Sequence, residues 1–183
     1  MPLFAAVCCA GILLLMAAGA AQRPAKAQDG GQSEIRRGLE IAPVPLNLNG
    51  KNVALVALGS YIVNANSDCN ACHTWANWAA GGNPYLGQPA RVNTAGYLAG
   101  GRPFNPPGVI SADITPWENG MPAGLTLDQF KNALRTGHDP DGSGRLLQIM
   151  PWPYFANMTD RDLEAIYEYL KAIPPIQPGP GAG

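Results

Sequence analysis

The chain has 183 residues, of which 46% are hydrophobic and 14% are charged, and its formal net charge is −1. This length suits one ordinary globular domain. The charge pattern argues against a nucleic-acid-binding protein, because no basic stripe runs along the sequence. A weakly acidic chain also has no strong attraction to anionic membrane surfaces.

The chain begins with an apolar segment that is typical of export. No charged side chain precedes Arg23, the run Leu3 to Ala21 is almost wholly apolar, and the small-x-small site Ala25-Lys26-Ala27 follows. We predict that residues 1–27 are a secretory signal peptide, cleaved after Ala27. The alternative is a retained membrane anchor, because the run is just long enough to span a bilayer.

The next segment, residues 28–50, is polar and then Pro-rich, and we expect it to form an extended arm. A helix is expected after Asn49-Gly50, because small and apolar residues recur there at three- and four-residue spacing. This helix should end between Asn64 and Asp68.

Residues 81–124 contain nine Gly and seven Pro among 44 positions. No long helix tolerates that composition. Large apolar residues such as Tyr97 and Leu98 nevertheless recur, so the segment is too apolar for a free linker. We expect an ordered loop packed on a large apolar surface, with a short hairpin around Val92 to Arg102.

Two capped helices are predicted in the last third of the chain. Thr126-Leu127-Asp128-Gln129 is a capping box, and the helix that it begins should end at Gly137. Thr159 begins the last helix, with acids in the first turn. Pro174-Pro175 ends this helix, and the tail 177–183 should be flexible. The apolar stripe of this last helix has i, i+3, i+4, i+7 spacing and consists of Leu163, Ile166, Tyr167 and Leu170.

The most specific pattern in the chain is Cys69-Asn70-Ala71-Cys72-His73. Cys-x-x-Cys-His is the attachment pattern for c-type haem. Each thiol adds to one haem vinyl group, and the two intervening residues set the sulfurs about one helical turn apart. His73 can then ligate the iron from the proximal side. Because the other cysteines, Cys8 and Cys9, lie in the predicted signal peptide, we predict one covalent haem c per chain.

Two other uses of these residues are open. A redox dithiol shares the Cys-x-x-Cys spacing, but it normally belongs to a βαβ pattern, whereas this chain shows helices separated by Gly/Pro loops. A zinc site with His138 as a further ligand is conceivable from the ligand count. However, adjacent Cys72 and His73 rarely both reach one tetrahedral metal.

The order of features resembles the class I, mono-haem cytochrome c family of bacterial periplasmic type. The resemblance covers roughly Lys51 to Pro175 and rests on a helix, Cys-Asn-Ala-Cys-His-Thr, a loop, Met-Pro and Asp-Leu-Glu-Ala-Ile-Tyr-Glu-Tyr-Leu. It implies a cytochrome c domain over residues 51–176. The implied fold is all-α, with three to four helices around one haem and the Gly/Pro-rich loop as an insertion. The first and last helices of that domain should cross at small and aromatic positions, with Gly59 and Tyr61 facing Leu163, Tyr167 and Leu170.

Met150 is predicted as the second axial iron ligand. It follows an apolar stretch, precedes Pro151, and stands where the family places its distal methionine. Met121, Met158 and His138 are the alternatives. The family commonly uses a proline carbonyl to accept a hydrogen bond from the proximal histidine. Pro84 is the candidate for that role, with a simple loop breaker as the other interpretation.

A haem with two protein ligands has no open site for a substrate. We therefore predict a periplasmic electron carrier that is not itself an enzyme. It would shuttle single electrons between a dehydrogenase and a respiratory acceptor, such as a terminal oxidase or another cytochrome. The alternatives are a haem c subunit of a periplasmic oxidoreductase complex, or an open-site haem enzyme if Met150 does not bind. Membrane association is expected only if the N-terminal segment is retained.

Overall fold

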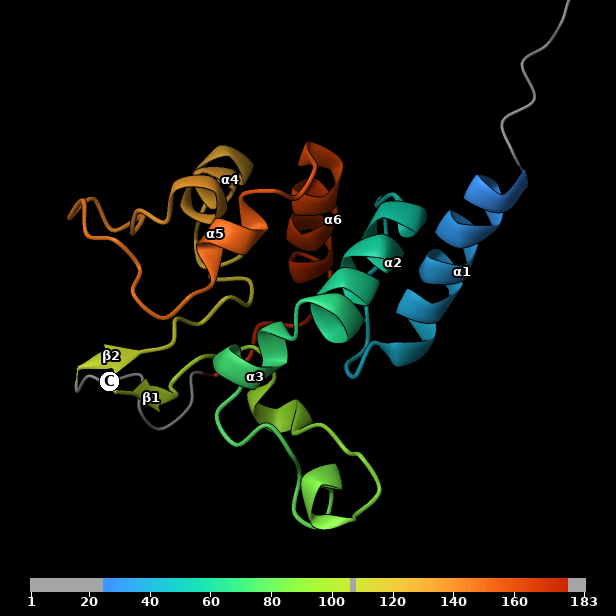
Figure 1. Ribbon diagram of the computed structural model, residues 1–183, viewed down its shortest axis with the longest axis horizontal. Helices are drawn as coiled ribbons and strands as arrows, with labels where there is room; N and C mark the ends of the chain where they lie inside the picture. Colours follow the sequence, from blue (N-terminus) through green and yellow to red (C-terminus); the bar gives the residue numbers. More distant parts are fainter. Residues whose placement is uncertain (1–24, 106–107, 178–183) are drawn as a thin grey trace, which may run out of the picture.

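The computed structural model of the protein describes residues 25–105 and 108–177. The apolar run Leu3 to Ala21 and most of the predicted tail lie outside the described residues. The described part is mostly helical, with one small antiparallel sheet (Figure 1). Its elements in chain order are α1 (Ala25–Ile41), α2 (Val53–Tyr61), the π-helical turn η1 (Ile62–Asn66), α3 (Cys69–His73), the 3₁₀ turns η2 (Pro84–Leu86) and η3 (Thr94–Gly96), β1 (Pro103–Phe104), β2 (Val109–Ile110), α4 (Leu127–Thr136), α5 (Trp152–Phe155) and α6 (Asp160–Leu170).

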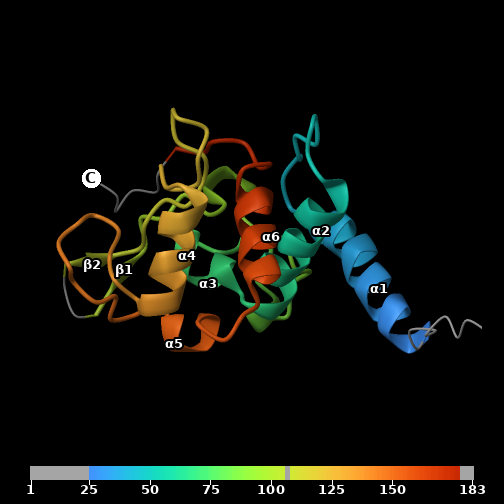
Figure 2. The same cartoon turned by 90° about the horizontal axis from the view of Figure 1, so that it is seen from above.

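Helix α2 lies between α1 and α6, and glycines allow both close approaches (Figure 2). A Cβ atom added at Gly38 of α1 would lie 1.9 Å from the carbonyl oxygen of Ala57. A Cβ at Gly59 of α2 would lie 1.9 Å from the carbonyl oxygen of Ala165. The predicted crossing at Gly59, between α2 and α6, is therefore confirmed. The nearest α6 residues there are Ala165 and Tyr169, in place of the expected Leu163, Tyr167 and Leu170.

The expectation of an extended arm over residues 28–50 is wrong for its first part, which is helical through Ile41. The sequence of this segment is too polar to predict a core helix. Its buried contact with α2 is made by the backbone at Gly38 and not by a stripe of apolar side chains. The chain becomes irregular at Ala42, close to the two prolines. Val44 is then buried, and the backbone N–H of Asn47 donates to the carbonyl of Ala172 at 2.8 Å.

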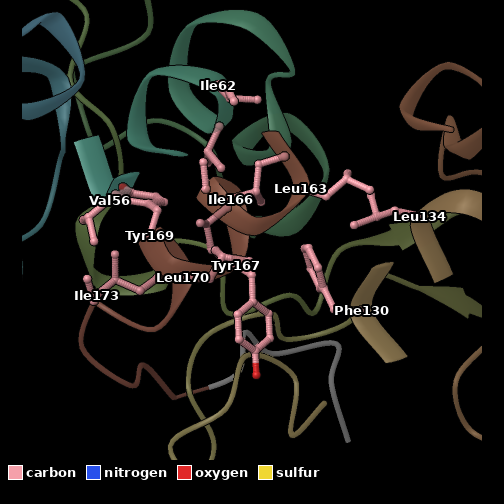
Figure 3. Close-up of a cluster of buried hydrophobic side chains, with 14 of the residues drawn as sticks. Val56, Ile62, Phe130, Leu134, Leu163, Ile166, Tyr167, Tyr169, Leu170 and Ile173 are labelled. Atoms are coloured by element: carbon pink, nitrogen blue, oxygen red, sulfur yellow. The ribbon is translucent and has the colours of Figure 1, made fainter. Parts of the chain in front are cut away.

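Helices α4 and α6 pack around a shared apolar core (Figure 3). The aromatic rings of Phe130 and Tyr167 lie 5.5 Å apart between centroids in a tilted arrangement. Both predicted helix starts are confirmed, because Thr126 and Thr159 each complete a capping box. Gly137 ends α4 with φ +71, as predicted. The predicted stripe of α6 is buried: Leu163, Ile166, Tyr167 and Leu170.

The glycine- and proline-rich segment is ordered, but two expectations for it need correction. The fold is not wholly helical, since Pro103 pairs with Ile110 and Phe104 with Val109 in a two-stranded sheet. The hairpin was predicted around Val92 to Arg102 but lies after these residues in the chain. Gly100 and Gly101 adopt positive φ angles, which interrupt a strand at the predicted position.

Only part of that segment packs on apolar surface. Tyr97 and Leu98 are fully buried, whereas Tyr85 is 86% and Leu86 is 71% exposed on η2. None of the helices in the described part of the chain is both long enough and apolar enough to cross a membrane.

Candidate functional site

The predicted haem attachment residues occupy one short helix. Cys69 and Cys72 stand three residues apart on α3, so their thiols lie on the same face of one helical turn, and His73 follows at the end. Both thiols are free and half-buried. The preceding residue, Asp68, is in the left-handed region with φ +46. The chain therefore turns sharply where it enters the motif.

A π-helical turn joins α2 to this motif. In η1 the N–H of Ser67 donates to the carbonyl of Ile62 at 2.8 Å, a bond across five residues. Such turns are rare and often mark functional sites. Within this turn, Asn64 donates through Nδ2 to the buried hydroxyl of Tyr169.

Asn64, Tyr97 and Tyr169 form a closed ring of hydrogen bonds. The Asn64 Nδ2 lies 2.9 Å from the carbonyl of Ser60, which can only accept, so the amide orientation is fixed. Tyr97 then donates to Asn64 Oδ1 at 2.6 Å, and Asn64 Nδ2 donates to Tyr169 at 3.2 Å. Since the Tyr97 proton is already used, Tyr169 donates to Tyr97 across 2.9 Å. Both tyrosines are fully buried.

The imidazole of His73 is held in the state that a metal ligand requires. Its Nδ1 lies 2.8 Å from the carbonyl oxygen of Ala112. A carbonyl can only accept, so Nδ1 carries the proton and the Nε2 lone pair is free for iron. Burial lowers the pKa of His73, which also favours the neutral ring, and the hydrogen bond to Ala112 partly opposes that shift.

The histidine's partner differs from the predicted one. The Pro84 carbonyl instead accepts the N–H of Gly87 at 3.0 Å within its own 3₁₀ turn. Pro84 therefore has a local turn role, and the carbonyl of Ala112, 39 residues after the histidine, accepts the hydrogen bond from His73.

The loop after η3 caps the C-terminal end of α3. The N–H of Gly100 donates to the carbonyl of His73 at 2.7 Å, and the N–H of Leu98 donates to Thr74 Oγ1 at 2.9 Å. The guanidinium of Arg102 donates to the carbonyl of Ala71. The bonds from Gly100 and Arg102 satisfy helix-end carbonyls that would otherwise lack partners. The sequence patterns did not predict these roles of Thr74, Ala112 and Arg102.

The environment of the thiols disfavours their ionised forms. Burial, together with the nearby charge of Asp68, raises the pKa of Cys69 to about 12. Burial also raises the pKa of Cys72, while the positive charge of Arg102 acts in the opposite direction. A reactive redox dithiol and a zinc ligand both need an accessible thiolate. Among the described residues, no group of three or more His, Cys, Asp and Glu could hold a metal ion.

The four candidates for a second axial ligand lie in different settings. Met150 is half-buried against the core and directly precedes Pro151, the N-cap of α5. Met158 borders a cavity of about 280 Å³ beside Leu58 and Ile62. Met121 is half-buried in the turn before α4, and His138 is exposed. Met158 therefore has the packing role of an apolar residue beside α2, and Met150 remains a predicted ligand.

Comparison with known proteins adds a family context. The chain is 33% identical over 124 residues to the cytochrome c subunit of alcohol dehydrogenase (quinone) from Gluconobacter oxydans. It is 33% identical over 117 residues to the fructose dehydrogenase cytochrome subunit of Gluconobacter japonicus. It is 32% identical over 128 residues to the gluconate 2-dehydrogenase cytochrome c subunit of Pantoea cypripedii.

These alignments cover 67%, 63% and 68% of this chain but 22%, 20% and 25% of the relatives. The chain thus spans only about a quarter or less of the length of these proteins. No protein-family model matches the chain, and no solved structure matches it significantly. All three relatives are cytochrome subunits of dehydrogenases, and this similarity supports a cytochrome c family for the chain.

Proposed function

We propose that this chain is a haem c-binding electron-transfer subunit of a dehydrogenase complex. The observation that carries the proposal is the pairing of two free thiols on one helical turn with an imidazole whose Nε2 is free. In this proposal, Cys69 and Cys72 form thioethers to one haem, and His73 ligates its iron. The bound haem would supply one-electron chemistry at the motif.

The similarity to subunits favours the complex over the freely diffusing shuttle that the sequence first suggested. The relatives are named as parts of alcohol, fructose and gluconate dehydrogenases. We propose a dehydrogenase as the electron donor to this chain, with a respiratory component as the acceptor. In this scheme the chain transfers electrons and the partner carries out catalysis.

We also propose that the chain binds a single haem in a class I cytochrome c fold, with Met150 as the second ligand. Met150 packs against the apolar core, and the backbone directly after it is restricted by Pro151, the N-cap of α5. A thioether ligand favours the reduced iron and raises the reduction potential. Export to the periplasm is part of the proposal, supported by the apolar run and the small-residue site that precedes Gln28.

The central test is expression with a c-type haem maturation system, followed by intact mass spectrometry and a pyridine haemochrome assay. We expect the mass of one added haem and a spectrum typical of two thioether bonds. Met150→Ala should remove the sulfur-to-iron charge-transfer band of the oxidised protein, whereas Met158→Ala should leave it unchanged. A haem-free mass would contradict the attachment site, and a band that survives Met150→Ala would contradict the ligand.

The partner is tested by purifying the tagged chain from its native host. We expect a dehydrogenase to co-purify, and we expect its substrate to reduce the haem of the isolated complex. Purification of the chain alone, with a haem that sugars, alcohols and sugar acids all fail to reduce, would favour the mobile shuttle.

A further inference from the structure

We propose that Arg102 is a positioning residue for the haem-binding motif and that its fixed positive charge raises the reduction potential of the haem there. This inference rests on the proposed function, because it assumes a haem at Cys69 and Cys72. It concerns a residue outside the Cys-x-x-Cys-His motif, placed beside it by the loop between η3 and β1.

The first step of the argument is the contact between Arg102 and the motif. The Arg102 Nη1 donates to the carbonyl of Ala71, the residue between the two cysteines, and also to Asn77 Oδ1 at 3.0 Å. Asn77 in turn donates through Nδ2 to the carbonyl of Asn70 at 2.5 Å. Arg102 and Asn77 thus hold both peptide carbonyls of the two residues that separate the cysteines.

The second step is the rigidity of the guanidinium. The backbone N–H of Arg102 donates to Ser111 Oγ at 2.9 Å, which ties the residue to the hairpin. Its guanidinium carbon lies 5.6 Å from the ring centroid of Phe104, a cation–π contact. The side chain is half-buried. The charge is therefore held in one place, and salt screens it less than it screens a fully exposed charge.

The third step is the absence of a neutralising partner. The ion pairs found in the described part of the chain do not include Arg102. Two carboxylates nearby have the opposite sign: Asp68 acts on Cys69, and Asp113 acts on His73. Neither carboxylate is among the ion pairs found in the described residues. Asp68 is exposed, and Asp113 accepts the N–H of Thr115 at 2.8 Å.

The sign of the effect follows from Coulomb's law. A nearby positive charge favours the oxidation state with less positive charge, which is ferrous iron. Arg102→Gln should lower the potential, with the reduced-to-oxidised ratio at a fixed ambient potential falling about three- to tenfold. A tenfold change corresponds to about 59 mV for one electron. Arg102→Lys keeps the charge but not the fork of donors, so it should retain most of the potential while lowering the melting temperature.

The experiment is a redox titration of the haem-loaded protein and these two variants. Arg91→Gln is the matched control, because Arg91 belongs to the same long loop but is exposed and donates to Ala80. We expect the potential of this control to stay unchanged. An unchanged potential in Arg102→Gln, or an equal fall in Arg91→Gln, would overturn the proposal. A fall in Arg102→Lys as large as that in Arg102→Gln would overturn its electrostatic part.

A further variant covers the case in which Arg102→Gln does not mature. Asn77→Asp leaves Arg102 in place and sets a carboxylate at the 3.0 Å contact, which would offset the guanidinium charge. Its potential should also fall, and an unchanged potential would count against the proposal. Absence of covalent haem from the unmodified protein would instead contradict the proposed function, so the two failures are distinguishable.

Discussion

The layer formed by α1, α2 and α6 and the loop-rich half from Thr74 to Gly124 are stabilised in different ways. The helical layer is held by apolar burial and by close backbone contacts at Gly38 and Gly59. The loop-rich half has little regular structure, and most of its cross-links are hydrogen bonds to backbone carbonyls (Figure 1). We therefore expect the helical layer to fold without a haem, whereas the loops need the group that they surround.

The largest expected effect comes from adding a side-chain atom at the close contact between α2 and α6. Gly59→Ala places a Cβ atom 1.9 Å from the Ala165 carbonyl oxygen, and backbone cannot yield as a flexible side chain can. Overpacking of this kind costs up to about 3 kcal/mol, and occasionally more. We expect a loss at the upper end of that range in denaturant unfolding.

Gly31→Ala is the control, because the described residues leave the space around Gly31 open. It should stabilise α1 by about 0.5–1 kcal/mol, as alanine does in a helix. Equal losses in the two variants would contradict the role assigned to the helix crossing.

The next largest effect separates the two regions directly. Replacing Cys69 and Cys72 together by alanine should prevent haem attachment. Hydrogen exchange should then show fast exchange over residues 74–124, while α2 and α6 keep their protection. Simultaneous loss of protection in both regions would show that the helical layer also needs the haem.

A smaller effect is expected where the two regions meet, at the ring of Asn64, Tyr97 and Tyr169. Tyr97→Phe leaves Asn64 Oδ1 without its donor and the Tyr169 hydroxyl without its acceptor, which should cost about 1–3 kcal/mol. Tyr169→Phe should cost less, because Tyr97 still donates to Asn64 and Asn64 still donates to the Ser60 carbonyl.

Tyr167→Phe on α6 is the matched control for this ring. It removes one hydrogen bond of 2.9 Å, to the carbonyl of Leu125, and should cost about 1 kcal/mol. The order of the three losses in urea unfolding tests the direction of the ring. A larger loss in Tyr169→Phe than in Tyr97→Phe would contradict it.

The smallest effect concerns the surface beside α4. A hydrogen bond from Arg135 and the charge of Lys131 lower the pKa of Asp160 below its ordinary value of 3.8. The native state thus binds this proton less tightly than the unfolded state, so the stabilisation exists above pH 3.8 and is lost as pH falls through the native pKa. In Asp160→Asn, the free energy of unfolding should therefore fall slightly less steeply as the pH is lowered through the acid range. An unchanged acid limb would show that the pair contributes nothing measurable.

Sequence patterns predicted the helices whose signals are local. Thr126 and Thr159 each carry a cap within four residues, and the Cys-x-x-Cys-His motif is contiguous, so these features were accessible from the sequence. The partner of His73 was not, because it is the backbone carbonyl of Ala112, and a carbonyl carries no residue-type signal. Helix α1 was missed for a related reason, since its buried contact is made by Gly38 and not by a stripe of apolar side chains.

The closed ring beside Cys69 also bears on proton coupling. Each hydroxyl proton in the ring is already donated to another member, and burial raises the pKa of Tyr97 well above 10 and also raises that of Tyr169. This side of the site therefore neither takes up nor releases a proton near neutral pH. Reduction or oxidation of a haem at this motif would therefore not be coupled to proton uptake or release by Tyr97 or Tyr169. Any pH dependence of its potential near neutrality would have to arise from other groups.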